Sequence, residues 1–145
     1  MRLALLVRIW RHSRAASAVE FALLAPVFFG LLFGVMQIGI YMQNYNAVRS
    51  LASDAARFAA VEYQKNNQVS AATMQDNIES MGVSAPYFLE SSQLTVAVTE
   101  ISPSSVDGSR QFDLDLTYAL PTLVGGISID ALTLTYSRQM FVLKV

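Results

Sequence analysis

The chain contains a hydrophobic segment that is long enough to cross a membrane. Residues 21–42 read FALLAPVFFGLLFGVMQIGIYM and contain no Asp, Glu, Lys, Arg or His. At about 1.5 Å per residue in a helix, this segment matches the roughly 30 Å hydrocarbon core of a bilayer. The pattern therefore predicts a transmembrane helix at about 21–42.

The helical pattern continues beyond the apolar segment. Apolar residues recur there at steps of three and four, as expected for one buried helix face, at Val48, Leu51, Ala55 and Phe58. Polar residues lie between them, and Asp54 and Arg57, three residues apart, can pair on the surface. We predict one helix from about Ala16 to Tyr63, which ends at the sequence QKNNQ of residues 64–68.

A short second helix is predicted after this break. Ser70 is the expected N-cap, and Met74, Ile78 and Met81 form one apolar face. The pattern stops at Gly82, which we predict to be the C-terminal cap because glycine commonly ends helices.

After Pro86 the apolar period changes to two, which is typical of strands. Alternation predicts three strands, which include or begin at Leu94, Val96 and Val98, at Phe112, Leu114 and Leu116, and at Leu132, Leu134 and Tyr136. Residues 102–109, with Asp107-Gly108 among them, read as a hairpin loop, and Pro121 and Gly125-Gly126 form the next connector. The predicted fold class is α+β: a long N-terminal helix, a short second helix and a small antiparallel sheet of about three strands packed on the upper helix.

The net charge of −1 conceals an asymmetry, because residues 1–19 carry +4 and residues 20–145 carry −5. The positive charges before the apolar segment are Arg2, Arg8, Arg11 and Arg14. The positive-inside bias therefore places the N-terminus in the cytoplasm and the remainder outside it. We expect a basic cytoplasmic leader at 1–15, the long helix at 16–64 and a small extracytoplasmic α+β domain at 65–145. Nucleic-acid binding is not expected, since the acidic remainder offers no basic surface to phosphates.

A cleaved secretory signal is the alternative to a retained membrane anchor. Such a signal has an apolar stretch of about 7 to 15 residues and a small-x-small cleavage site soon after it. The apolar segment here is longer, and the best small-x-small candidate, Ser50-Leu51-Ala52, lies well beyond its end in the predicted helix. The pattern favours a retained anchor.

Several residues of the apolar segment are candidates for helix packing or anchoring. Pro26 lies near its start, where a helix tolerates proline best. Gly30 and Gly34 form Gly-x-x-x-Gly, a spacing that lets two helices approach closely in lipid, although glycine is also common in membrane helices for other reasons. Tyr41 and Tyr45, one turn apart at the outer end, are typical of anchoring at the membrane interface.

Catalytic and metal-binding patterns are weak in this sequence. The chain has no cysteine, and its single histidine, His12, lies among the N-terminal arginines, so no Ser-His-Asp arrangement is available outside the membrane. Asp113 and Asp115 share a strand face and can hold a hard cation, but such alternation more often marks a solvated face. Gly125-Gly126 lacks the following Lys-Ser/Thr of a phosphate loop. We therefore expect no enzyme activity, no cofactor and no metal.

Glu20 is unusual because it stands where the basic N-terminus ends and the apolar helix begins. A carboxylate at that depth costs energy unless it is paired or reaches water. One interpretation is that Glu20 reaches the headgroups and complements the positive end of the helix. The other is a role in assembly, which depends on the neighbouring residues.

The segment from Arg14 to Pro26, RAASAVEFALLAP, resembles the N-terminal signature of TadE-like proteins, the minor pilins or pseudopilins of tight-adherence (Tad/Flp) pilus systems. The core of the motif is Val-Glu-Phe-Ala-Leu-x-Ala-Pro, and it begins with Val19, Glu20 and Phe21. The later sequence AARFAA, residues 55–60, is similar to the Ala/Arg-rich end of that family's long helix. The resemblance covers about residues 11–60.

The resemblance implies that a prepilin peptidase on the cytoplasmic face removes a short basic leader and leaves the apolar helix in place. The family's glutamate is the fifth mature residue, which puts the cut between Ala15 and Ala16. The family's usual residue before the cut is glycine, and Ala15 departs from that pattern. The resemblance also implies that Glu20 neutralises the new amine on Ala16, its own or a neighbour's.

The implied function is that of a minor pilin in the assembly or initiation of an adhesive pilus. The implied partners are other minor and major pilin subunits, the prepilin peptidase, the inner-membrane assembly platform and the lipid bilayer. The implied location is the bacterial inner membrane, in a single pass, or the pilus after processing. The alternative is a single-pass, membrane-anchored extracytoplasmic binding or sensory domain that is unrelated to pili and keeps residues 1–15.

Overall fold

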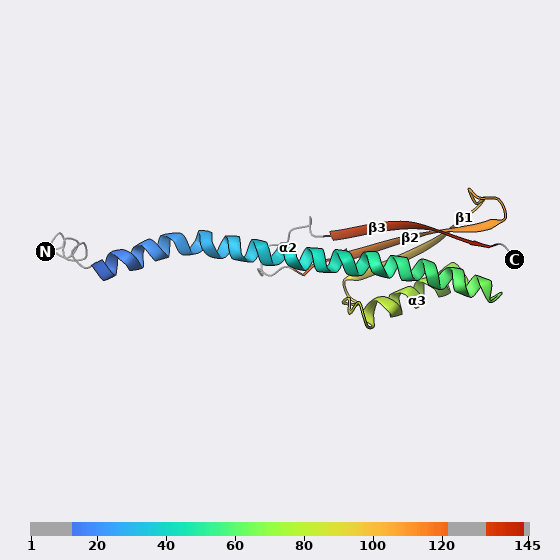
Figure 1. Ribbon diagram of the computed structural model, residues 1–145, viewed down its shortest axis with the longest axis horizontal. Helices are drawn as coiled ribbons and strands as arrows, with labels where there is room; N and C mark the ends of the chain where they lie inside the picture. Colours follow the sequence, from blue (N-terminus) through green and yellow to red (C-terminus); the bar gives the residue numbers. More distant parts are fainter. Residues whose placement is uncertain (1–12, 122–132, 144–145) are drawn as a thin grey trace. The chain divides into compact units, whose positions relative to one another are not determined.

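A computed structural model of the chain describes residues 13–121 and 133–143 (Figure 1). Side chains are described from Ala16 onward. The chain divides into two compact units, Met1–Gly39 and Ile40–Val145. The first unit holds most of the apolar segment, and the second holds the sheet, the short helix and the hydrophobic core.

One helix, α2 (Ser13–Gln64), passes through both units and confirms the single long helix predicted from the apolar pattern. Pro26 lies inside α2, more than three turns from its first residue, so its expected place near a helix start is wrong. Proline has no backbone N–H, and the carbonyl of Ala22, four residues earlier, therefore loses its usual helical partner. Membrane helices tolerate this loss where a neighbouring helix or a local adjustment satisfies the carbonyl.

The second helix, α3 (Ala71–Val83), begins as predicted but ends differently. The Oγ of Ser70 accepts a hydrogen bond of 3.2 Å from a backbone N–H of the first turn, as an N-cap does. Gly82 is not the C-terminal cap, because it is buried inside the helix and Ser84 is the cap. A Cβ at position 82 would lie 2.6 Å from Cδ2 of Leu94, so close packing against the sheet requires the glycine there.

Three strands form one antiparallel sheet in the order β1-β2-β3, which confirms the α+β prediction (Figure 1). The strands are β1 (Leu94–Ile101), β2 (Ser109–Ala119) and β3 (Thr133–Leu143). Gly108 has a φ of 75°, a conformation that suits glycine, in the predicted hairpin loop between β1 and β2. The predicted Gly125-Gly126 connector and Leu132 lie outside the described residues.

The core of the second unit lies between one face of the sheet and the two helices. Strand β2 contributes Phe112, Leu114 and Leu116, which have no exposed surface, and Leu116 pairs with Val96 of β1 and Tyr136 of β3. Helix α2 contributes buried residues at helical spacing: Val48, Leu51, Ala52, Ala55, Ala59 and Tyr63. Because three of these are alanines, the sheet can approach the helix closely. Each large apolar side chain buried here contributes about 1.5–3 kcal/mol.

A polar and aromatic cluster fastens the C-terminal end of α2 to the sheet. The Tyr63 hydroxyl donates to the carbonyl of Val69 at 3.0 Å and accepts from Nη1 of Arg110 at 2.9 Å. The Arg110 guanidinium forms two more bonds of 2.8 Å to the Glu100 carboxylate and lies over the rings of Tyr63 and Phe112. These bonds lower the pKa of Glu100 and raise the pKa of Arg110. The cluster therefore ties α2, the segment after it and two strands together.

Candidate functional site

The first unit presents a large apolar surface along α2. Phe21, Leu23 and Val35 have relative exposures of 65%, 72% and 69%. Ala16–Gln64 is the one helix among the described residues that is long and apolar enough to cross a membrane. Leaving a large apolar side chain in water forgoes about 1.5–3 kcal/mol of burial energy, so this surface is suited to lipid or to other apolar helices.

One side of this helix is formed by small residues. Pro26, Gly30 and Gly34 follow one another at steps of four and therefore share a side of α2. A Cβ added at Gly30 or Gly34 would meet nothing within 4 Å, so the glycines leave an open strip of backbone. The rings of Phe29 and Phe33 stack nearby along the helix, with centroids 6.4 Å apart. Such a strip beside bulky side chains lets a second helix approach closely in lipid.

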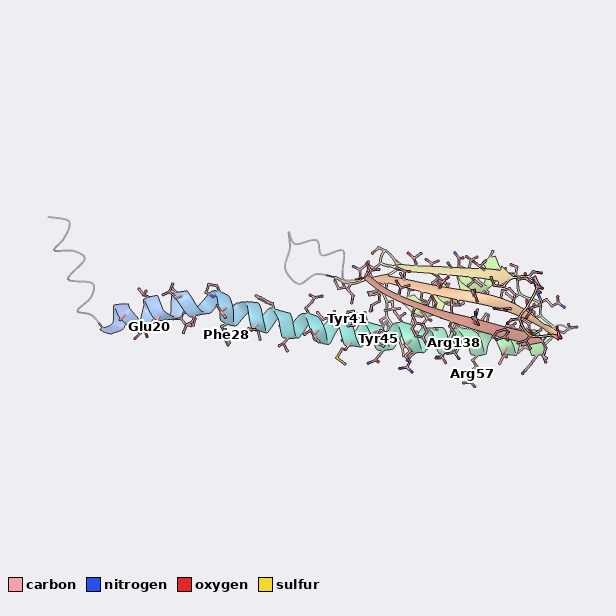
Figure 2. All side chains as sticks on the ribbon, turned by 90° about the horizontal axis from the view of Figure 1, so that it is seen from above. Glu20, Phe28, Tyr41, Tyr45, Arg57 and Arg138 are labelled. Atoms are coloured by element: carbon pink, nitrogen blue, oxygen red, sulfur yellow. The ribbon has the colours of Figure 1, made fainter. Side chains whose placement is uncertain are left out.

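Glu20 is the carboxylate of the first unit (Figure 2). It is exposed, as are its neighbours Val19 and Phe21, with relative exposures of 56% and 65%. Glu20 lies four residues, or about one helical turn, after Ala16, so the two residues share a face of α2. The structure does not describe residues 1–12 or the side chain of Ala15. Of the two residues at the predicted cut site, only Ala16 has a described side chain.

Tyr41 and Tyr45 form an aromatic pair at the start of the second unit (Figure 2). Their rings stack with centroids 6.4 Å apart and an angle of 7° between the planes. Both side chains are about two-fifths exposed, at 39% and 38%. Amphipathic rings at the end of an apolar segment suit the headgroup region of a membrane, which remains our interpretation of this pair.

Asp113 and Asp115 lie on the face of β2 opposite to the core. The Ser137 hydroxyl of β3 donates to the Asp115 carboxylate, and one buried oxygen of Asp113 has no hydrogen-bond partner in the described structure. Within the described residues, no group of three His, Cys, Asp or Glu side chains comes together in a way that could hold a metal ion. Two carboxylates, of which one already accepts a hydroxyl, make a poor ligand set for a hard cation.

The expected surface pair of Asp54 and Arg57 does not form. The Tyr87 hydroxyl donates instead to the Asp54 carboxylate. Burial, together with this hydrogen bond, raises the pKa of Tyr87 to about 12. Arg57 is exposed and makes no ion pair with any described residue.

Sequence reasoning missed the contacts that join distant segments of the second unit. Nη1 of Arg138 on β3 donates to Oγ of Ser53 on α2 at 2.9 Å. Arg110 on β2 bonds Tyr63 at the end of α2 in the same way. The only local sequence feature at either contact is an arginine within a strand of alternating apolar residues, and this feature does not indicate which residue the arginine contacts.

The fold and the exposed helix define a class of protein: a small α+β domain attached to one helix that is able to anchor it in a membrane. Residues 15–57 of the chain match the family model described as TadE-like protein. This match confirms the resemblance carried by the motif at Arg14–Pro26 and associates the protein with the Tad pilus. The matched region ends within α2, before α3 and the sheet. No curated protein and no solved structure gives a match to the chain.

Proposed function

We propose that the protein is a minor pilin or pseudopilin that takes part in the assembly or initiation of a Tad/Flp-type adhesive pilus. The match of residues 15–57 to the TadE-like family carries the proposal. The exposed apolar helix with Glu20 near its start supports it. The TadE-like family is not an enzyme family, so the protein acts by binding other subunits rather than by catalysis.

Processing by a prepilin peptidase between Ala15 and Ala16 gives Glu20 a charge partner. The new α-amino group on Ala16 lies one helical turn before Glu20 and can be neutralised by it, either in the same chain or between neighbours. An isolated charge near lipid is costly, and pairing the amine with the carboxylate offsets that cost.

The apolar helix, the leader and the α+β domain have separate roles in this proposal. The strip formed by Pro26, Gly30 and Gly34 packs against helices of other minor and major pilin subunits in the inner membrane. The leader at 1–15 faces the cytoplasm, the peptidase and the assembly platform, because its arginines follow the positive-inside bias. The α+β domain is extracytoplasmic and enters the pilus or its initiating complex.

Intact mass and N-terminal sequencing of the membrane-extracted protein test the proposal. The protein is co-expressed with the cognate prepilin peptidase or with an inactive variant of that peptidase. We expect a start at Ala16 with the active peptidase only. An intact Met1 start in both cases would overturn the proposal and favour a membrane-anchored binding or sensory domain. Ala15→Gly should be processed at least as fast as the native sequence, and slower processing would show that the cut lies elsewhere.

Substitution of Glu20 tests the role of the charge. Glu20→Ala should strongly reduce piliation and leave membrane insertion intact, because the apolar segment is unchanged. Val19→Ala is the matched control, since it also shortens an exposed side chain but removes no charge. Normal piliation by the Glu20→Ala protein, once its leader is removed, would contradict the pairing role.

A further inference from the structure

Three arginines that make no ion pair with a described residue gather on one side of the second unit. The described residues of this unit include five basic side chains, of which Lys65 and Arg110 are paired with acids. The other three, Arg49, Arg57 and Arg138, are exposed and make no ion pair with any described residue. Arg49 and Arg57 lie two turns apart on α2, and Arg138 lies on β3 beside the helix (Figure 2). We call these three residues the basic face.

Ser53 connects the two elements of the basic face. It lies four residues from both Arg49 and Arg57, so all three share a side of α2. Its Oγ accepts the 2.9 Å hydrogen bond from Nη1 of Arg138 and lies 3.1 Å from the Arg49 carbonyl, to which it donates. The guanidinium of Arg138 is therefore held against α2 at Ser53, at a level between Arg49 and Arg57.

Helix α3 and the segment that follows it carry exposed acidic side chains. Residues 66–99 include three acids and no Lys or Arg, and we call these acids the acidic face: Asp76, Glu79 and Glu90. All three are exposed, and none makes an ion pair with a described residue. Helix α3, which carries two of them, packs on β1, whereas Arg138 lies on β3. Because β1 and β3 are the two edges of the sheet, the two acids of α3 and Arg138 lie toward different edges.

The two faces lie at the same level along α2. A Cβ on Gly82, near the end of α3, would lie 3.0 Å from Cδ2 of Leu51. Val69, just before α3, accepts the hydrogen bond from Tyr63. Helix α3 therefore runs antiparallel to α2, beside the stretch of α2 that includes Arg57. Within the second unit, the basic face and the acids of α3 therefore lie beside the same stretch of α2, so two copies of the unit side by side can bring them together.

We propose that the basic face docks onto the acidic face of a second copy of this chain. The contact is heterologous, so each copy keeps one free face and the contact can be repeated from copy to copy. Charge complementarity selects this pairing and disfavours contact between two like faces. This interface goes beyond the proposed function, because it concerns the folded domain and does not depend on removal of the leader.

Cysteine cross-linking between full-length chains tests the interface, because the chain has no native cysteine. Ser50 on α2 and Val83 at the end of α3 are both exposed, and they adjoin Leu51 and Gly82, which lie at one level. Ser50→Cys and Val83→Cys are introduced into separate chains with different tags, which are mixed in zwitterionic lipid vesicles and oxidised. We expect Ser50→Cys to cross-link to Val83→Cys well above its cross-linking to itself. Thr135→Cys, on the opposite sheet face, is the matched control and should show background cross-linking to Val83→Cys.

Charge reversal tests the electrostatic basis of the contact. Arg49→Glu with Arg57→Glu in the Ser50→Cys chain should lower the cross-linked yield about fivefold, since each exposed ion pair contributes a factor of about two and reversal adds repulsion. Asp76→Arg with Glu79→Arg in the partner chain should restore the yield. High salt should weaken the native contact, because exposed charges are screened.

An unchanged yield after arginine reversal, or no rescue by the second reversal, would overturn the proposed interface. Equal yields of the Ser50→Cys homodimer and the mixed dimer would also overturn it. An effect of arginine reversal that requires anionic lipid would assign the basic face to lipid headgroups instead of a second copy. If the chains cross-link as expected but keep an intact Met1 start when co-expressed with the active peptidase, the interface is retained and the proposed pilin function is refuted. The two proposals can therefore fail separately.

Discussion

Gly82→Ala measures how closely α3 packs on the sheet. The added methyl group would lie 2.6 Å from Cδ2 of Leu94 and 3.0 Å from Cδ2 of Leu51, which is closer than ordinary van der Waals contact. Overpacking of this kind costs about 1–3 kcal/mol, and alanine recovers about 1 kcal/mol of helix propensity. We expect the free energy of unfolding to fall by about 1 kcal/mol, which lowers Tm by about 4–8 °C for a domain of this size.

A double-mutant cycle with Leu94→Ala separates the packing effect from any backbone effect. Leu94 is 5% exposed, and its truncation alone should cost about 2–5 kcal/mol. In that background the methyl group of Gly82→Ala occupies vacated space, and its effect should become neutral or stabilising. The expected coupling energy is about 1–2 kcal/mol, as for residues in contact. Ser80→Ala, on the exposed side of α3, controls for helix propensity.

Urea unfolding of the full chain in non-ionic detergent provides the measurement. The near-ultraviolet circular dichroism of the tyrosines follows the domain, because the single tryptophan, Trp10, lies outside it. An equal cost of Gly82→Ala in the native and the Leu94→Ala backgrounds would refute the packing explanation and restore the helix-cap interpretation.

Three further predictions concern polar contacts of the same unit. Tyr63→Phe should lower the free energy of unfolding by about 1–2 kcal/mol in the same assay, because its hydroxyl takes part in two hydrogen bonds. Arg110 lowers the pKa of Glu100, so this pair stabilises the fold above the ordinary carboxyl pKa of 4.5. The stabilisation is lost as the pH falls through the lowered pKa. Glu100→Gln should therefore make the free energy of unfolding depend less on pH at the acid end. Tyrosinate absorbance should show Tyr87 titrating near pH 12, and Asp54→Asn should lower that pKa, whereas an unchanged titration would contradict their hydrogen bond.

The sequence correctly predicted those elements whose formation depends on a pattern of neighbouring residues. The apolar segment predicts α2, the period of two predicts the strands, and Ser70 predicts the start of α3. Gly82 shows the limit of such reasoning. A glycine is suited both to a helix cap and to a tight packing contact, in each case because it has no Cβ, so the sequence alone does not tell the two roles apart. Only the approach of Leu94 distinguishes the two. Asp54 shows the same limit, since its partner Tyr87 is 33 residues away and Arg57 is three.

The sequence by itself determined an apolar segment long enough to cross a membrane, the position of Glu20, the family resemblance of the N-terminal segment and the order of helices and strands. These follow from periodicity, charge and motif, which are properties of neighbouring residues. The tertiary structure decided which side chains meet. Arg138 joins Ser53 on α2, and Arg110 joins Tyr63, because β3 and β2 pack across the same helix. The grouping of Arg49, Arg57 and Arg138 also arises only there, since these arginines come from two elements that are distant in the sequence. Long-range contacts depend on how elements pack, and no local pattern in the chain specifies that packing.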